Sequence, residues 1–382
     1  MNNFCYAYGI SYWKRHILKK MKRLIIILFV AIALLSACSP IKEEHHKTLF
    51  FFYPWSTNLT HYFENNIATF ERALEAKDLR SNRVVVFISQ SESKACMYEI
   101  KMDRGRCVHD TIARFEEYNY EYTSVEGLVK LLDLAKGAVA TPKFAMAIGC
   151  HGDAWIPARD MKRSFGGVSV ESRIDISTLR DALCRSNIVA EYILFDDCYM
   201  SSVEVAYELR NVCGYLIASP AEIMAAGMPF GDIAQDLLGE PNYEAICEDF
   251  YKYYANNRST PYGTIAVTRC DELERLADIV KRINAMGGEP MRDVQFYDGY
   301  NPHIFYDLGD YVGAICDDAG LLNEFYAQMD RCIPYKRHTE YVYVYGFGRV
   351  KVERYSGIST SVLSENGKCV SYAETSWGKR TL

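Results

Sequence analysis

Two short apolar segments each run into a chemically reactive residue, and this pattern constrains the fold more than any other feature of the chain. Phe144–Ile148 leads within three residues to His151, and Tyr192–Phe195 leads within three residues to Cys198. Apolar runs of this length that stop at polar or glycine residues predict buried strands. Because the carboxyl ends of parallel strands share one edge of an α/β sheet, we expect an imidazole and a thiol side by side there, as a cysteine nucleophile requires.

Strands and helices are expected to alternate along most of the chain, which predicts a doubly wound, mainly parallel sheet between helices. The remaining strands are expected at 49–53, 83–88, 214–219 and 262–268, with a small hairpin of 97–101 and 107–114. Helices are expected at 59–77, from Ser124 to 134, at 176–186 and at 202–210. β structure should return at 341–347 and 358–363.

Five sequence elements in a fixed order carry a resemblance to a known family. They are His151-Gly152 after one strand, Asp196-x-Cys198 after a later one, and three elements nearer the C-terminus: Tyr306–Tyr311, Ser356–Ser361 and Tyr372–Trp377. The chain resembles the clostripain-like cysteine peptidases, which are grouped with caspases, gingipains and legumain. The match spans roughly Leu49 to the C-terminus, and Tyr372–Trp377 looks like the family's closing helix, which ends in Trp. The resemblance implies a caspase-like α/β sandwich with a C-terminal helical and β extension.

A catalytic dyad follows from the same segments. His151 is expected to accept the proton of Cys198 and later to protonate the leaving amine. The backbone N–H groups of Gly152 and Cys198 would bind the oxyanion. No Asn or Asp is clearly placed in the sequence to orient His151, so two catalytic side chains are expected. Cys150 should face away from His151, because adjacent strand residues point to opposite faces.

Asp196 is the expected source of substrate selection. It stands two residues before Cys198, so both side chains fall on one face of the strand end. In the family this acid lies in the S1 pocket and selects Arg or Lys, because a carboxylate in a partly dry pocket attracts a cation. Ser219 and Glu222 lie in the segment that ends the next strand and are expected in the pocket wall, with Glu222 as a second candidate acid. Asp197 should point the other way and be structural.

Each residue also has a plainer interpretation. A His-Gly after a strand is commonly a turn, a buried Cys is commonly core, and a strand-end Asp is commonly a helix cap. The five elements together favour a cysteine endopeptidase that cleaves after Arg or Lys. Two alternatives stay open: a non-catalytic surface lipoprotein that binds peptide or glycan, and an amidase with a Cys nucleophile.

The N-terminus predicts an exported lipoprotein. Lys19–Arg23 precedes the apolar run Leu24–Leu34, and Leu35–Cys38 resembles a bacterial lipobox with Cys38 as the lipid attachment site. The apolar run is shorter than a bilayer-spanning helix usually needs. We therefore expect an envelope lipoprotein, at the outer membrane or cell surface, which meets the membrane through its lipid.

The expected organisation follows from these segments. It comprises an upstream extension at 1–20, a signal peptide at 21–37, a linker at 38–47, a catalytic core at 48–260 and a C-terminal α/β region at 261–382. The loop 153–172 carries the basic residues Arg159, Lys162 and Arg163, and an enzyme that selects basic residues could cut itself there. An uncut, constitutively open enzyme is the alternative.

Composition bears on cofactors and partners. The net charge of −6, without a basic stripe, gives no reason to expect a nucleic acid partner. None of the 13 cysteines has zinc-ligand spacing with a second pair nearby, so no metal is expected to be required. Asp317-Asp318 leaves calcium open, although the pair lacks ordered ligand spacing. Cys96 and Cys107 are the expected disulfide of the exported protein.

Overall fold

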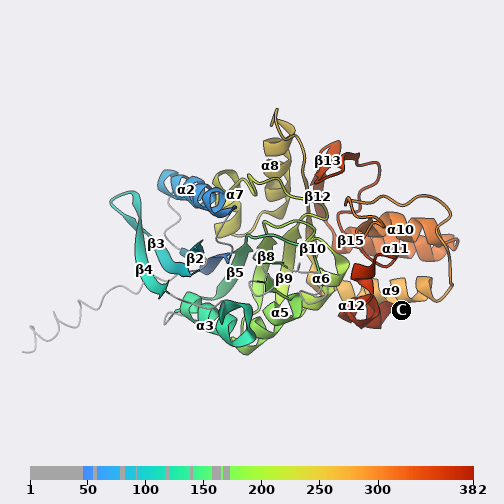
Figure 1. Ribbon diagram of the computed structural model, residues 1–382, viewed down its shortest axis with the longest axis horizontal. Helices are drawn as coiled ribbons and strands as arrows, with labels where there is room; N and C mark the ends of the chain where they lie inside the picture. Colours follow the sequence, from blue (N-terminus) through green and yellow to red (C-terminus); the bar gives the residue numbers. More distant parts are fainter. Residues whose placement is uncertain are drawn as a thin grey trace, which may run out of the picture. The chain divides into compact units, whose positions relative to one another are not determined.

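The structure is a computed structural model that describes residues 46–54, 58–77, 82–91, 93–116, 121–137, 141–156, 165–166 and 173–382 (Figure 1). Residues 45–382 form one compact unit. The expected division at residue 260 stays a prediction, although β10 and β12, which follow it, belong to the same central sheet as the strands before it.

The central sheet has nine strands in the order β12-β10-β9-β8-β5-β1-β2-β3-β4. Their bounds are β1 Lys47–Tyr53, β2 Asn82–Ser91, β3 Lys94–Asp103, β4 Arg106–Glu116, β5 Lys143–Ile148, β8 Ala190–Phe195, β9 Cys213–Ala218, β10 Thr264–Arg269 and β12 Tyr335–His338. The five strands β9-β8-β5-β1-β2 are parallel, and antiparallel pairs extend both edges. The expected mainly parallel sheet is therefore confirmed.

Helices cover both faces of this sheet (Figure 1). The helices α2 Thr60–Ala76, α7 Phe230–Leu238 and α8 Tyr243–Ala255 lie on one face; α3 Val125–Lys136, α5 Ile176–Arg185 and α6 Val203–Leu209 lie on the other. Strands covered on both faces should be largely apolar, and β1 is apolar from Leu49 to Tyr53, with all seven of its residues buried. The predicted stripe of α2 is buried as well, at Phe63, Ile67, Phe70 and Leu74.

The C-terminal part of the chain adds helices and short strands beyond one end of the sheet. The helices are α9 Leu273–Asn284, α10 Leu308–Ile315, α11 Ala319–Cys332 and α12 Ser376–Thr381. Small pairs join β11 Tyr306–Asp307 with β15 Ser359–Thr360 and β13 Tyr341–Val344 with β14 Gly348–Lys351, while β6 Phe165–Gly166 pairs with β7 Arg173–Ile174. Short 3₁₀ turns lie at Glu121–Thr123, Cys270–Glu272, Gly367–Cys369 and Tyr372–Glu374.

Local capping chemistry explains where helices begin. The predicted cap at Ser124 is confirmed, because its hydroxyl accepts a hydrogen bond from the N–H of Gly127 at 3.0 Å. The closing helix differs from the expectation, since Trp377 lies in its first turn rather than at its end. The Thr375 hydroxyl accepts from the N–H of Gly378 at 2.9 Å and so starts α12 at Ser376.

The expected disulfide between Cys96 and Cys107 is wrong. Both thiols are free, and the antiparallel register of β3 and β4 pairs Cys96 with Arg114 and Cys107 with Met102. The two cysteines are therefore separated along the hairpin by the six residue steps from Cys96 to Met102, about 20 Å of strand. A disulfide needs Cα atoms within about 7 Å.

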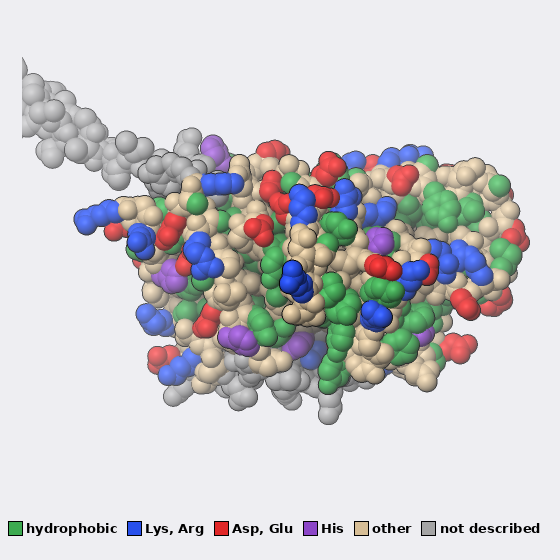
Figure 2. Space-filling view, turned by 90° about the horizontal axis from the view of Figure 1, so that it is seen from above, with side chains coloured by type: hydrophobic (Ala, Val, Ile, Leu, Met, Phe, Trp, Pro, Cys, Tyr) green, Lys and Arg blue, Asp and Glu red, His purple; other side chains and the backbone are tan. Residues whose placement is uncertain are grey.

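Charges of both signs are mixed on the surface. On the face drawn in Figure 2, Lys and Arg side chains are interspersed with Asp and Glu. Within the described residues, no helix is both long and apolar enough to span a bilayer. Cys38 and the apolar run before it lie outside the described residues.

Candidate active site

Strands β5 and β8 deliver the two reactive residues to the same edge of the sheet. They are parallel neighbours, with Ile148 opposite Phe195. The ladder continues one step further, because the N–H of Asp196 donates to the carbonyl of Ile148 at 2.7 Å. His151 lies three residues after the end of β5, and Cys198 lies three residues after the end of β8.

The two segments touch at Gly152. A Cβ atom at this position would meet the carbonyl oxygen of Cys198 first, then Cβ of Asp197 at 2.9 Å and the sulfur of Met200 at 3.1 Å. Only a glycine allows the backbone after His151 to lie so close to the backbone of Cys198. The contact brings the backbone of Gly152 beside the backbone of Cys198, the two residues whose N–H groups are the expected oxyanion donors.

His151 is held through both its backbone and its ring. Its carbonyl accepts from the N–H of Gly166 at 2.9 Å in an isolated bridge. Its Nε2 lies 3.4 Å from Oδ1 of Asn58. Asn58 was not among the residues that the sequence predicts at the site. The available signal was its position just beyond β1, the strand beside β5, whose carboxyl end must reach the same edge.

The Cys198 side chain is half-buried. Its sulfur accepts a hydrogen bond from the N–H of Ile223 at 3.4 Å. Burial raises the pKa of the Cys198 thiol, the negative charge of Glu222 raises it further, and the Ile223 N–H acts in the opposite direction. A thiol with a raised pKa is protonated at neutral pH, so it needs a base to become a nucleophile.

Asp196 is buried on the opposite side of the strand end from Asp197. Its Oδ1 accepts from the N–H of Met228 at 2.8 Å, and its Oδ2 accepts from the Asn66 amide at 3.4 Å. Gly227, at φ +70°, packs so closely that a Cβ there would lie 2.8 Å from Oδ1. Burial raises the pKa of the Asp196 carboxyl to about 7, against the lowering effect of the Met228 N–H.

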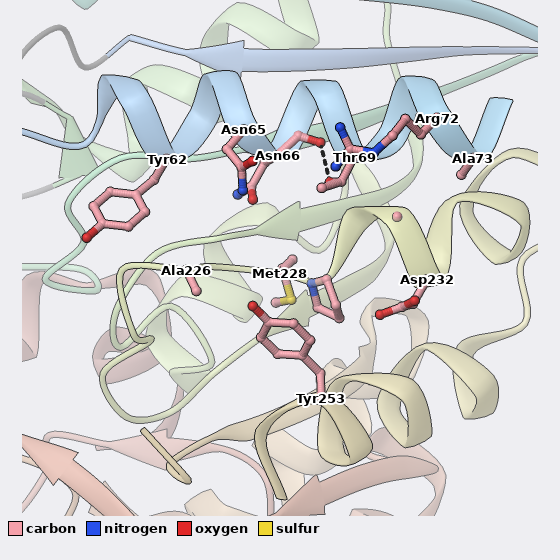
Figure 3. Close-up of a pocket in the computed structure, with 12 residues that line it drawn as sticks. Tyr62, Asn65, Asn66, Thr69, Arg72, Ala73, Ala226, Met228, Asp232 and Tyr253 are labelled. Atoms are coloured by element: carbon pink, nitrogen blue, oxygen red, sulfur yellow. Dashed lines mark hydrogen bonds between the residues drawn. The ribbon is translucent and has the colours of Figure 1, made fainter. Parts of the chain in front are cut away.

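A cavity of about 480 Å³ opens between α2, α7 and α8 next to Asp196. Figure 3 shows Tyr62 and Asn66 extending from α2, with Met228, Asp232 and Tyr253 on the other side of the cavity. Asn66 and Met228 line this cavity and also bond the Asp196 carboxylate. His151, Cys198 and Asp196 are not among its lining residues. The cavity therefore adjoins the candidate pocket acid and does not contain the two reactive residues.

Asp197 and Cys150 form a buried pair beneath the site. The N–H of Cys150 donates to Oδ1 of Asp197, and its thiol lies 3.4 Å from Oδ2. Burial raises the pKa of the Cys150 thiol, and the charge of Asp197 raises it further. Asp197 therefore holds Cys150 in place as a neutral hydrogen-bond donor.

The two expected wall residues have different environments. The Ser219 side chain is fully buried, and its hydroxyl lies 2.6 Å from the Thr264 hydroxyl, so it supports the wall from behind. Glu222 is only partly buried, and its Oε1 accepts from the Tyr199 hydroxyl at 2.9 Å and the Tyr345 N–H at 2.8 Å. Burial raises the pKa of Glu222. These two hydrogen bonds therefore hold the Glu222 carboxylate in place.

A buried carboxylate joins the segment after Cys198 to the C-terminal strand. Glu204 accepts hydrogen bonds from the Ser202 hydroxyl at 2.5 Å, the Thr360 hydroxyl at 2.8 Å and the Ser361 N–H at 3.0 Å. The Ser361 hydroxyl in turn accepts from the indole N–H of Trp155 at 3.0 Å. The Ser356–Ser361 element is thereby tied to the segments that follow both reactive residues.

The predicted calcium candidate and the predicted cleavage loop remain to be described. Asp318 caps α11, with Oδ1 accepting from the N–H of Leu321 at 2.9 Å. Among the residues that the structure describes, no group of three or more His, Cys, Asp or Glu side chains is arranged to hold a metal ion. Arg159, Lys162 and Arg163 of the expected cleavage loop lie outside the described residues.

Comparison with known proteins agrees with this fold. The sequence profile described as the clostripain family matches residues 53–372. A secreted C11 cysteine protease from Bacteroides thetaiotaomicron, called iotapain, is 40% identical, with a TM-score of 0.85, and the match covers 88% of this chain and 99% of that one. No curated protein matches significantly. The chain belongs to the clostripain family and is a cysteine protease.

Two other solved structures are similar. A clostripain from Bacteroides thetaiotaomicron in complex with the peptide inhibitor BTN-VLTK-AOMK is 46% identical, with a TM-score of 0.56, and the match covers 57% of this chain and 98% of that one. An inactive zymogen C11 protease from Parabacteroides distasonis is 25% identical, with a TM-score of 0.77, over 88% of this chain and 98% of that one.

Proposed function

We propose that this protease hydrolyses peptide bonds after Arg or Lys, with His151 and Cys198 as the catalytic dyad. The packing of Gly152 against the backbone of Cys198 carries the proposal, because it joins the two segments at the end of neighbouring parallel strands. The peptide VLTK, in the name of the inhibitor bound to a 46% identical clostripain, ends in lysine. That similarity supports a basic residue at the cleavage site.

The reaction would proceed in two steps. His151 removes the proton of the Cys198 thiol, and the thiolate attacks the substrate carbonyl carbon while the N–H groups of Gly152 and Cys198 stabilise the oxyanion. The C–N bond breaks as His151 gives its proton to the leaving amine, which leaves a thioester on Cys198. Water, deprotonated by His151, then hydrolyses the thioester and restores the thiol.

Asp196 would select the basic side chain. Its carboxylate lies on the same strand end as Cys198 and is held by Met228 and Asn66. A Lys or Arg side chain would provide the positive charge that favours the ionised carboxylate in this buried place. A neutral side chain would leave that charge unpaired.

The test of the dyad uses three variants. Cys198→Ala and His151→Ala should each abolish cleavage of Arg and Lys amides with unchanged circular dichroism, and with losses of similar size because the residues act as a unit. Cys150→Ser should stay active, since a hydroxyl can replace the thiol as donor to Asp197. Labelling of Cys198 by a Lys-directed acyloxymethyl ketone would separate the protease from a non-catalytic relative. Turnover by purified Cys198→Ala protein would refute the assignment.

We also propose that the enzyme is an exported lipoprotein that cuts its own loop. The related iotapain is described as secreted, and another relative as an inactive zymogen; both descriptions support export and activation. Cys38→Ala should release the protein from the membrane fraction. Mass spectrometry should find cleavage after Arg159, Lys162 or Arg163 in the wild type and not in Cys198→Ala. Fully active, uncut wild-type protein would exclude a required cleavage.

We propose no metal requirement. The dyad supplies both the nucleophile and the base, so no step depends on a bound cation. Activity should be unchanged by dialysis against a chelator, and a loss that added calcium restores would contradict this.

A further inference from the structure

A hairpin tip with two exposed aromatic side chains follows β13. The tip, residues 345–347, joins β13 to β14. Tyr345 is 83% exposed and Phe347 is 57% exposed. They differ from aromatic residues such as Phe51 and Tyr192, which are buried in the core. Large aromatic side chains held together in water at one site commonly mark a binding surface.

A hydrogen bond places this tip beside the nucleophile. The N–H of Tyr345 donates to Oε1 of Glu222 at 2.8 Å. The next residue, Ile223, donates its own N–H to the sulfur of Cys198 at 3.4 Å. The tip is therefore one side chain and one peptide unit away from the Cys198 thiol.

A second, independent set of contacts gives the same location. Gly299 packs on the hairpin so closely that a Cβ there would lie 2.7 Å from Val344 and 3.1 Å from Cβ of Phe347. The next residue along, Tyr300, donates its hydroxyl to Asp153 at 2.9 Å, and Asp153 is two residues beyond His151. The loop that supports the tip is thus bonded to the segment that carries the histidine.

The same loop also contacts the cysteine segment. The ring of Phe305 stacks on Tyr199, the residue after Cys198, with ring centroids 4.6 Å apart. Phe347 is supported from beneath by the rings of Phe296 and His303, at centroid distances of 6.2 and 6.3 Å. The aromatic tip is consequently held in place at the rim of the catalytic site, and the Tyr345 side chain remains open to solvent.

We propose that Tyr345 and Phe347 bind an apolar side chain of the polypeptide substrate, one that flanks the basic residue selected by Asp196. This inference rests on the proposed function. Ile223, the residue after Glu222, contacts the Cys198 sulfur, so an extended polypeptide with its scissile bond at Cys198 would pass the rim beside Glu222. An apolar side chain there would cover aromatic surface that is otherwise exposed to water. The protease would then read two features of its substrate, a cation in the pocket and an apolar residue on the tip.

The experiment measures binding and cleavage separately. Inactive Cys198→Ala protein is titrated with fluorescent peptides that carry one lysine and differ by Leu or Ser at each of the three positions on either side. One flanking position should prefer Leu. Adding Tyr345→Ala or Phe347→Ala should reduce that preference by about three- to tenfold, the scale of one aromatic contact. Tyr251→Ala is the matched control, because Tyr251 is an exposed aromatic residue on α8.

Cleavage then separates the inference from the proposed function. In active protein, Phe347→Ala should leave kcat/KM for a single-residue lysine amide unchanged and lower it for the Leu-flanked peptide. An equal loss on both substrates, or an unchanged Leu preference in Tyr345→Ala and Phe347→Ala, would overturn the inference while leaving the dyad intact. Failure of the wild type to cleave any lysine or arginine substrate would refute the proposed function, and the binding titration would still decide whether the tip binds apolar side chains.

Discussion

Gly152 packs against the backbone of Cys198 so closely that a side chain at residue 152 has no space. A Cβ there would lie 2.9 Å from Asp197 and 3.1 Å from Met200, and closer still to the carbonyl of Cys198. The contact joins the strand that ends near the imidazole to the strand that ends near the thiol. Its consequences can be measured.

Gly152→Ala should strongly reduce activity. The added methyl group must push the segment after His151 away from Cys198, and displacements of about 1 Å can lower the rate about a hundredfold. The measurement is kcat/KM on a lysine amide together with the melting temperature. Gly367→Ala is the control, because a Cβ there meets nothing within 4 Å. Full activity in Gly152→Ala would show that the contact does not position the dyad.

Asp196 should make the preference for basic residues depend on pH. Its pKa of about 7 follows from burial, so the carboxyl is neutral below that pH and negative above it. The ratio of kcat/KM for an Arg substrate to that for its citrulline analogue should therefore rise as pH increases through about 7. The ratio cancels the ionisation of the dyad, which both substrates share.

A variant without the Asp196 charge tests the same pH dependence. Asp196→Asn should lower kcat/KM for Arg and Lys substrates by about a hundredfold and make the ratio independent of pH. If Asp196→Asn keeps full activity and Glu222→Gln loses it, Glu222 is the pocket acid instead.

Asn58 should position the His151 ring. Its Oδ1 lies 3.4 Å from Nε2 of His151, and one hydrogen bond of about 1 kcal/mol corresponds to about a fivefold change in rate. Asn58→Ala should lower kcat by that amount with little change in KM, and Asn58→Asp, which keeps the acceptor, should restore most of it. A change in KM alone would indicate a substrate contact.

Glu204 should stabilise the fold around the site. Its carboxylate accepts three hydrogen bonds while fully buried. Glu204→Gln replaces one acceptor oxygen with a donor and leaves buried donors unpaired, so the free energy of unfolding should fall by about 1–3 kcal/mol. Urea denaturation measures the change. The exposed Glu340→Gln should leave stability unaltered, and an equal effect of the two variants would contradict the structural role.

Local sequence patterns were enough to predict several strands and the start of one helix. Apolar runs such as Leu49–Tyr53 and Arg83–Ile88 became buried strands, because helices cover both faces of the sheet and leave no polar side. Ser124 caps its helix because a hydroxyl at this position satisfies an N–H of the first turn. These features depend on neighbours within a few residues, which a sequence displays directly.

Contacts between distant segments were beyond sequence reasoning. The predicted disulfide was wrong because spacing along the chain does not show that Cys96 lies opposite Arg114 and Cys107 lies opposite Met102 in the hairpin. Asn58 was missed because its distance from His151 depends on β1 lying beside β5. Ser219 was expected in the pocket wall, but its hydroxyl is turned toward Thr264 inside the protein.

The sequence by itself determined the family, the mainly parallel sheet and the order in which histidine, acid and cysteine meet one edge of it. These follow from strand-length apolar runs and from residues that immediately follow them. Only the tertiary structure decided that Gly152 touches Cys198, that Asn58 reaches His151 and that the aromatic tip at Tyr345 stands beside Glu222. Each of these contacts joins residues that are tens of positions or more apart in the chain, and packing of the whole core is what brings them together.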